Sequence, residues 1–255
     1  MDLPPAVNAL IDNVHSINSN TIVVSRTGMP VTMPWASKVP AIIQAWYGGN
    51  ESGNSIADVL FGDFNPCGKL PISWPRTISD NPAYLYFGSK TRVLFGDDIY
   101  AGYRWYDKLD RTPLWSFGHG LSYTTFTLSI AKVFNNCAPS GRRRISASVR
   151  IENTGPVHGA EVVQLWVSAE HSSYQRPMRE LHGFQKVHLA PGEVREVDVH
   201  VDEYAMAVWD EGEDKWCVES GDYRLSAISS AGGLDPCSRD EVLFNVEEPY
   251  RWRGL

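Results

Sequence analysis

The chain has 255 residues, a length that suits one large domain or two ordinary ones. Its formal net charge is −7, and this acidic balance argues against nucleic acid as the main partner because phosphate binding needs a basic surface. No run of 18 apolar residues occurs, so the sequence predicts no membrane-spanning helix and no membrane partner.

The N-terminal part has the pattern of an α/β domain. Apolar residues recur at helical spacing over residues 4–18, which predicts a helix. Two short apolar runs, 21–25 and 41–46, are typical of buried parallel strands. Residues 56–60 suit a short helix, and 70–74 suit a further strand. This order predicts the last part of an α/β sheet over residues 1–81.

Residues 82–117 form an aromatic-rich stretch without a clear period. We expect it to be a long connection that packs on both domains, with its rings filling the space between them.

From residue 118 onward, apolar residues alternate with period two, which is the pattern of half-buried strands. Turn-forming residues separate the alternating segments. About seven such strands over 118–255 predict an immunoglobulin-like or fibronectin-like β-sandwich. The alternating sets are Ile145, Ala147, Val149 and Ile151; Val163, Leu165 and Val167; Val197, Val199 and Val201; Tyr223, Leu225 and Ala227; and Val242, Phe244 and Val246.

Four cysteines, Cys67, Cys137, Cys217 and Cys237, form no C-x-x-C pair, so the sequence gives no sign of a zinc ribbon or a thioredoxin-like site. Their number in a chain of this length leaves the disulfide state and the redox compartment open. The histidines are scattered without a metal-binding spacing, and no metal is expected.

The segment from Gly62 to Leu70 looks at first like a phosphate-binding loop. It has five residues between its glycines where that loop has four, and Leu70 stands where a metal-binding hydroxyl is required. We therefore interpret it as a tight turn, with Lys69 exposed to solvent.

Known catalytic patterns are absent from the sequence. There is no G-x-S-x-G motif, which would mark a Ser-His-Asp hydrolase. Asp97 and Asp98 are adjacent, so in an extended segment they point to opposite faces. A retaining glycosidase needs two carboxyl groups about 5–5.5 Å apart, and the chain suggests no such pair.

Glu51 is the carboxylate in the most suggestive position. It follows the second strand and begins a helix in a glycine-rich turn, and ligands of open α/β sheets gather at such places. A carboxylate at a helix N-terminus is also stabilised by the helix dipole. We favour the structural role and keep substrate binding as the alternative.

Trp46 and Tyr47 precede this turn and carry rings that could stack on a sugar. Most aromatic residues of the chain are expected to fill the space between domains. These two are the best candidates for exceptions, so the predicted substrate-binding residues are Trp46, Tyr47 and Glu51.

Long motifs, in a fixed order over nearly the whole chain, resemble glycoside hydrolase family 3. The first is WYGGNESGNSIADVLFG, and the closest likeness is to the β-glucosidases of the family. The motifs lie at residues 46–62, 65–75, 99–107, 117–126, 149–155, 159–164, 179–184 and 189–193.

The resemblance implies a (β/α)8 barrel, an α/β sandwich domain and a fibronectin-III-like domain, in that order. It implies a retaining mechanism on β-glucosides or cellobiose, in which an Asp of the barrel is the nucleophile and a Glu of the α/β sandwich is the acid/base. It implies no cofactor. A secreted enzyme is in keeping with the family, although the first residues do not read as a signal peptide.

This sequence matches only the last part of that arrangement. The barrel and its Asp are absent, and the first four residues resemble the stretch that follows the acid/base Glu. No catalytic residue is therefore assigned, and we expect the segment to be inactive without the barrel domain. The alternative is a non-catalytic sugar-binding or scaffold module. An incomplete α/β domain should also expose apolar faces that favour association.

Overall fold

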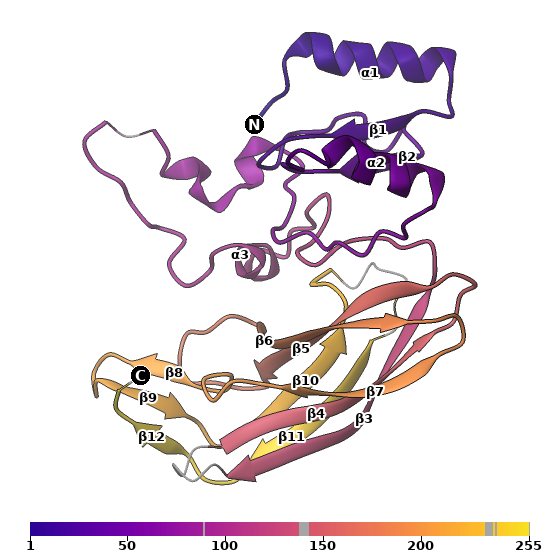
Figure 1. The fold of residues 1–255 in the computed structure, drawn as a ribbon. Coiled ribbons are helices and arrows are strands. Elements are labelled where there is room, and N and C mark those ends of the chain that lie inside the picture. Colours follow the sequence, from indigo (N-terminus) through magenta and orange to yellow (C-terminus); the bar gives the residue numbers. More distant parts are fainter. Residues whose placement is uncertain (89, 138–142, 233–236, 238, 255) are drawn as a thin grey trace. The chain divides into compact units, whose positions relative to one another are not determined.

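The computed structural model describes residues 1–88, 90–137, 143–232, 237 and 239–254, without the side chains of Cys137 and Arg143. The chain divides into two compact units, which are described separately (Figure 1). The α/β unit comprises Met1–Phe64, Ser73–Asp98 and Thr112–Trp115. The sandwich unit comprises Asn65–Ile72, Ile99–Arg111 and Ser116–Leu255. The domain boundaries expected at 81/82 and 117/118, and the packing of 82–117 on both domains, stay predictions.

The α/β unit contains a two-stranded parallel sheet, in which Ile22 pairs with Ala41 and Ser25 with Gln44. The predicted helix over residues 4–18 and the two predicted strands after it are confirmed, with Pro5 at the first helical turn, where a missing N–H costs nothing. The elements are α1 (Pro5–Ile17), β1 (Ile22–Ser25), β2 (Ala41–Gln44), α2 (Ser52–Phe61), and the 3-10 helices η1 (Ile78–Asp80) and η2 (Pro82–Leu85).

Tryptophans dominate the small core of this unit. Trp74 is fully buried and donates its Nε1–H to the Val31 carbonyl at 2.8 Å. Trp35 is buried and donates to Asn8 Oδ1 on α1 at 3.0 Å. Helix α1 nevertheless buries none of its residues, which confirms the expected exposure of apolar faces. Its exposed apolar residues are Val7, Leu10, Val14 and Ile17.

The strand predicted at 70–74 is wrong. The segment is extended, but it makes only separate hydrogen-bonded contacts, Leu70 with 118–119 and Trp74 with 114–115. Pro71 and Pro75 lack the N–H groups that a continuous ladder requires, and this explains why no strand forms.

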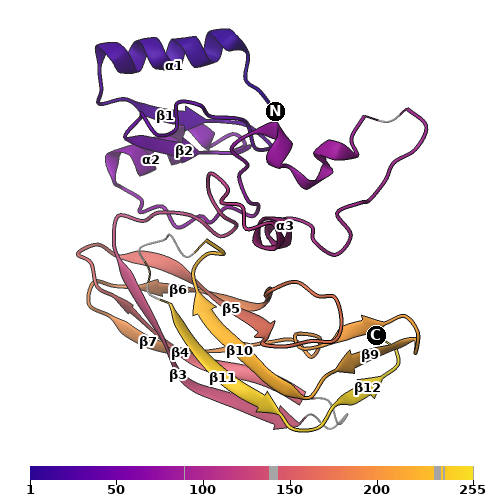
Figure 2. The ribbon, with the colours of Figure 1, turned by 180° about the vertical axis from the view of Figure 1, so that it is seen from behind.

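Over its described residues, the sandwich unit has two main sheets and one small sheet (Figures 1 and 2). One main sheet has the order β3-β4-β7, the other β11-β10-β5-β6, and the small sheet β12-β9-β8. The strands are β3 (Phe126–Cys137), β4 (Arg143–Asn153), β5 (Gly159–Ala169), β6 (Glu180–Leu189), β7 (Val194–His200), β8 (Val208–Asp210), β9 (Lys215–Val218), β10 (Gly221–Ile228), β11 (Asp240–Val246) and β12 (Tyr250–Trp252). The expected fold class, a partial α/β sandwich domain followed by a fibronectin-III-like or immunoglobulin-like β-sandwich, is confirmed.

The core of the sandwich lies between the inner faces of the two main sheets. The alternating residues of β4, such as Val149 and Ile151, are fully buried in one cluster with Leu165 of β5 and Leu225 of β10. The period-two pattern of the sequence thus marks the inner faces correctly, because neighbouring residues of a strand point to opposite sides.

Strand β5 is also covered on its other side. Trp166 is buried under the rings of Tyr103 and Phe117, at centroid distances of 4.7 and 6.1 Å. Tyr103 begins helix α3 (Tyr103–Lys108), which sequence analysis missed because its aromatic residues show no clear period. Burial raises the pKa of Tyr103, and its hydroxyl accepts the Leu181 N–H at 3.1 Å.

Candidate substrate-binding site

The predicted site residues follow the carboxyl end of β2, beside the carboxyl end of β1. Because the two strands are parallel, the loops that leave them lie at the same edge of the sheet. Gln44 joins the loops by donating its Nε2–H to the Thr27 carbonyl at 2.9 Å. The Ala45 N–H donates to the Ser25 carbonyl at 2.8 Å. The site is thus built on a fixed sheet edge.

Trp46 has a left-handed backbone conformation, with φ of 49°. A non-glycine residue in this region costs about 1–2 kcal/mol, so the surrounding structure must hold it there. Its ring packs on Trp74, with centroids 6.0 Å apart and planes tilted by 57°. Trp46 is half-buried, and its ring is therefore partly committed to the core of the α/β unit.

Tyr47 presents its ring to solvent, with 84% of the residue exposed. The ring lies against Gly28 of the neighbouring loop, where a Cβ atom would come within 2.4 Å of the Tyr47 hydroxyl oxygen. The absence of a side chain at Gly28 allows this close approach. Of the two predicted aromatic residues, Tyr47 is the one whose ring is open to a ligand.

Glu51 precedes the first residue of α2 without capping the helix through its side chain. Its Oε2 accepts a hydrogen bond from Asn54 Nδ2 at 2.6 Å, and its carbonyl accepts the Ser55 N–H at 3.0 Å. These contacts belong to the helix terminus, as the structural interpretation expects. A substrate-binding role for Glu51 stays a prediction.

Two polar atoms at this edge were missed by sequence analysis. Gln44 Oε1 and Ser52 Oγ are buried, and neither has a hydrogen-bond partner among the described residues. A Cβ atom on Gly48 would lie only 2.5 Å from Ser52 Oγ, so any larger residue at position 48 would clash with this hydroxyl. The only signal for Gln44 was its polar side chain inside an apolar run. Unpaired buried polar atoms are unusual and mark a place where a ligand or water could satisfy them.

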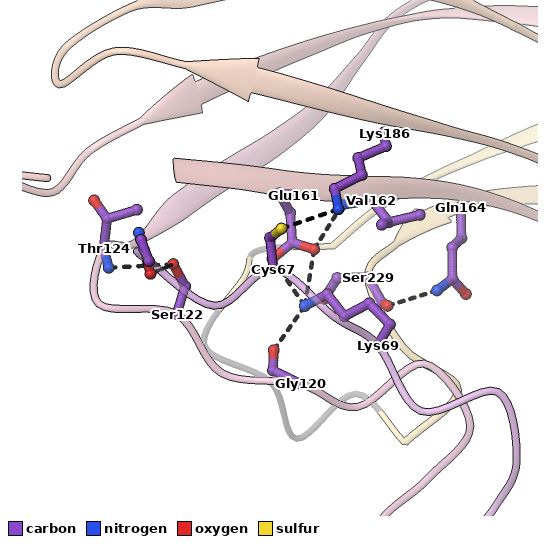
Figure 3. Close-up of polar contacts among 11 residues, drawn as sticks. Cys67, Lys69, Gly120, Ser122, Thr124, Glu161, Val162, Gln164, Lys186 and Ser229 are labelled. Atoms are coloured by element: carbon purple, nitrogen blue, oxygen red, sulfur yellow. Dashed lines mark hydrogen bonds and ion pairs between the residues drawn. The ribbon is translucent and has the colours of Figure 1, made fainter. Parts of the chain in front are cut away.

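A second polar cluster lies in the sandwich unit and corrects one expectation (Figure 3). Lys69, expected to be exposed, has only 11% of its side chain exposed and pairs with Glu161 Oε1 at 2.8 Å. Its Nζ also donates to the Gly120 carbonyl at 2.7 Å. The segment around Lys69 can bury the lysine because a carboxylate and a carbonyl accept hydrogen bonds from its ammonium group, which no local sequence pattern reveals.

The same segment is anchored at Asn65 and carries Cys67. Asn65 Nδ2 donates to the His158 carbonyl at 3.0 Å, while its Oδ1 accepts the Tyr123 N–H at 2.8 Å. Cys67 Sγ lies 2.9 Å from Lys186 Nζ on β6. Cys67 and Cys217 are in no disulfide, and the side chain of Cys137 lies outside the described part of the chain.

The two clusters differ in what they can do chemically. At the sheet edge, an exposed ring stands beside polar groups, which is an arrangement suited to a ligand with both apolar faces and hydroxyls. In the second cluster the opposite charges of Lys69 and Glu161 neutralise each other, which suits a structural role. Within the described ranges, no group of three or more His, Cys, Asp or Glu side chains could hold a metal ion. The described helices include none long and apolar enough to cross a membrane.

Comparison with known families gives two matches. Residues 1–123 match the glycosyl hydrolase family 3 C-terminal domain, and residues 161–231 match a fibronectin type III-like domain. Among curated proteins, the chain is 49% identical over 257 residues to a probable beta-glucosidase H of Neosartorya fischeri. It is 48% identical over 263 residues to a probable beta-glucosidase I of Aspergillus fumigatus. Both comparisons include 100% of this chain and 30% of the relative.

Solved structures give the same correspondence. A beta-glucosidase from Kluyveromyces marxianus in complex with glucose has 44% identity and a TM-score of 0.93, over 100% of this chain and 30% of that one. Beta-glucosidase 3B from Thermotoga neapolitana, in complex with alpha-D-glucose, has 34% identity and a TM-score of 0.87, over 99% and 35%. The chain therefore spans about a third of the length of the proteins it matches and corresponds to their C-terminal part.

Proposed function

We infer, because this chain belongs to glycoside hydrolase family 3, that the complete polypeptide is a retaining β-glucosidase. It would remove terminal β-D-glucosyl residues from β-glucosides or cellobiose. The observation that carries this proposal is the 49% identity to a probable beta-glucosidase along the entire chain.

The division of labour follows from the chemistry. A retaining mechanism needs a nucleophilic carboxylate and an acid/base carboxyl group about 5–5.5 Å apart. We place both outside this chain, the Asp on a (β/α)8 barrel and the Glu ahead of α1. Glu51 is no substitute, because one carboxyl group cannot supply both the nucleophile and the acid/base. The chain alone should therefore be inactive.

Trp46, Tyr47 and Glu51 are proposed to help bind the glucoside. The exposed ring of Tyr47 offers a face for the apolar side of a sugar, and Trp46 holds the turn that presents it. The carboxyl edge of a parallel sheet is also where ligands of α/β domains gather.

Hydrolysis of an aryl β-glucoside tests the proposed activity. We expect no turnover above background from the 255-residue chain, and turnover from a polypeptide that also contains the barrel. Turnover by the chain alone that is lost in Glu51→Gln would contradict the placement of the catalytic carboxylates. An inactive long polypeptide with correct folding would contradict the activity itself.

A non-catalytic sugar-binding module is the second candidate, and the exposure of Tyr47 is the observation that favours it. Titration with cellobiose, followed by tryptophan fluorescence, distinguishes it. Saturable quenching in the chain alone, lost in Tyr47→Ala and kept in the control Tyr84→Ala, supports binding without catalysis. No response leaves a structural role for this turn.

A further inference from the structure

Cys67 and Lys186 meet although 119 positions separate them in the sequence. Cys67 lies in the segment Asn65–Ile72, and Lys186 lies on β6. The 2.9 Å between Sγ and Nζ is a direct contact with no room for a water molecule (Figure 3). Lys186 is exposed and Cys67 is partly exposed, so small molecules in solution can reach the pair.

The contact is held by the backbone on both sides. On one side, Asn65 fixes the segment two residues before Cys67, and the buried ion pair of Lys69 fixes it two residues after. On the other side, Lys186 is in register with Val162 in the interior of the β5–β6 ladder. A fixed encounter of this kind gives two groups a high effective concentration for reaction with each other.

Two lysine amines lie near Cys67, and the one that contacts its sulfur is the amine of Lys186. The amine of Lys69 is directed to Glu161 and to the Gly120 carbonyl. The sulfur of Cys67 is partly exposed, so a peroxide can reach and oxidise it. Cys217, by contrast, is buried and less accessible to an oxidant.

We propose that Cys67 and Lys186 are an oxidative modification site, at which a peroxide produces a covalent sulfur–nitrogen bond. The thiolate attacks hydrogen peroxide, so sulfur is oxidised to a sulfenic acid and the peroxide is reduced to water. The lysine amine then attacks the sulfur, an S–N bond forms, the S–O bond breaks, and hydroxide leaves with a proton of the amine as water. The product has two hydrogen atoms fewer than the reduced pair.

The bond would fasten the segment Asn65–Ile72 to β6 and so close a covalent loop over the chain from Cys67 to Lys186. Loop closure of this size disfavours the unfolded chain. A thiol reductant would reverse it by attacking the sulfur, which releases the amine and leaves a mixed disulfide that a second thiol resolves.

Peptide mapping of the full chain after mild hydrogen peroxide treatment tests the proposal. Trypsin does not cut after a modified lysine, so residues 39–69 should be recovered joined to residues 180–195. Their combined mass should be lower than that of the two separate peptides by two hydrogen atoms, and dithiothreitol should separate them. Near-ultraviolet circular dichroism shows whether each protein remains folded.

Two variants and one control make the test specific. Cys67→Ser and Lys186→Arg should each abolish the joined peptides, and Lys186→Arg keeps the positive charge. Lys132→Arg, on β3, should retain them at the level of the unchanged chain. Oxidation of Cys67 to the sulfinic acid without joined peptides, in the folded protein, would overturn the proposal. Joined peptides in Lys186→Arg would overturn it as well.

Discussion

The sandwich unit buries alternate residues of facing sheets, whereas the α/β unit leaves the apolar side of its first helix in solvent. Leu165 and Leu225 have no exposed surface in the sandwich. Leu10 of α1 has 61% exposed, although its spacing is that of a packed helix. Both regions thus have regular apolar patterns, but only in the sandwich unit are the apolar side chains of the pattern buried against a neighbouring sheet.

The difference has a physical cause in the layers of each unit. The sandwich supplies two sheets that cover each other, and α3 and Phe117 add cover outside β5. The α/β unit has two parallel strands, and parallel sheets are stable when helices cover both faces and further strands extend them. We expect the α/β unit to be the less stable of the two.

The largest expected effect is at the buried ion pair of the sandwich unit. Lys69→Met should lower the free energy of unfolding by about 3–5 kcal/mol, because it removes the buried ammonium group that pairs with the carboxylate of Glu161. Urea unfolding measures the change. The double variant Lys69→Met/Glu161→Gln should recover most of the loss. A change below about 1 kcal/mol in the single variant would show that the pair is solvated.

A matched pair of leucines compares the two regions directly. Leu165→Ala should cost about 2–5 kcal/mol, because it opens a cavity between the sheets. The same substitution at Leu10 should change stability by less than about 0.5 kcal/mol, because the side chain is exposed. Urea unfolding of both variants provides the comparison. Similar losses at the two sites would mean that α1 is covered in solution.

Two glycines test how closely the backbone packs in each unit. A Cβ atom at Gly120 would lie 2.2 Å from the Gly68 carbonyl oxygen, so Gly120→Ala should cost about 1–3 kcal/mol. At Gly28 the obstacle is the exposed Tyr47 ring, which can move, so Gly28→Ala should cost less than about 0.5 kcal/mol. Thermal unfolding ranks the two. An equal cost would show that the Tyr47 ring is fixed.

The smallest expected effect concerns acid stability of the sandwich. Burial raises the pKa of Glu219, but hydrogen bonds from Ser172 and Ser173 outweigh it and hold the pKa below its ordinary 4.5. The ionised carboxylate therefore contributes stability above the unfolded pKa, and this is lost as pH falls through the folded pKa. In Ser173→Ala, the free energy of unfolding should therefore fall less on acidification than it does in the unchanged chain. An unchanged pH dependence of urea unfolding in this variant would contradict the assignment.

Sequence reasoning succeeded where a pattern is local and repeated. Alternation at Ile145–Ile151 and Tyr223–Ala227 predicted the inner faces of β4 and β10, because period two follows from strand geometry alone. Helical spacing predicted α1 in a similar way, because the period of 3.6 follows from helix geometry alone. The long motifs then identified the family, which no periodicity could do.

Several of the failures involve contacts between distant segments. Lys69 is buried because Glu161, 92 positions away, accepts a hydrogen bond from its ammonium group. The strand predicted at 70–74 did not form, because prolines interrupt its pairing with 114–119. The unpaired atoms of Gln44 and Ser52 depend on how two loops meet at the sheet edge. The identity of a single residue does not reveal which distant residue it contacts.

Native-state hydrogen exchange of the intact chain tests the central contrast most directly. Amides of β4, β5 and β10 should exchange only when the sandwich unfolds as a whole. Amides of α1, β1 and β2 should exchange at least about tenfold faster, because the α/β unit opens at a lower free energy. Equal protection in the two regions would contradict the account.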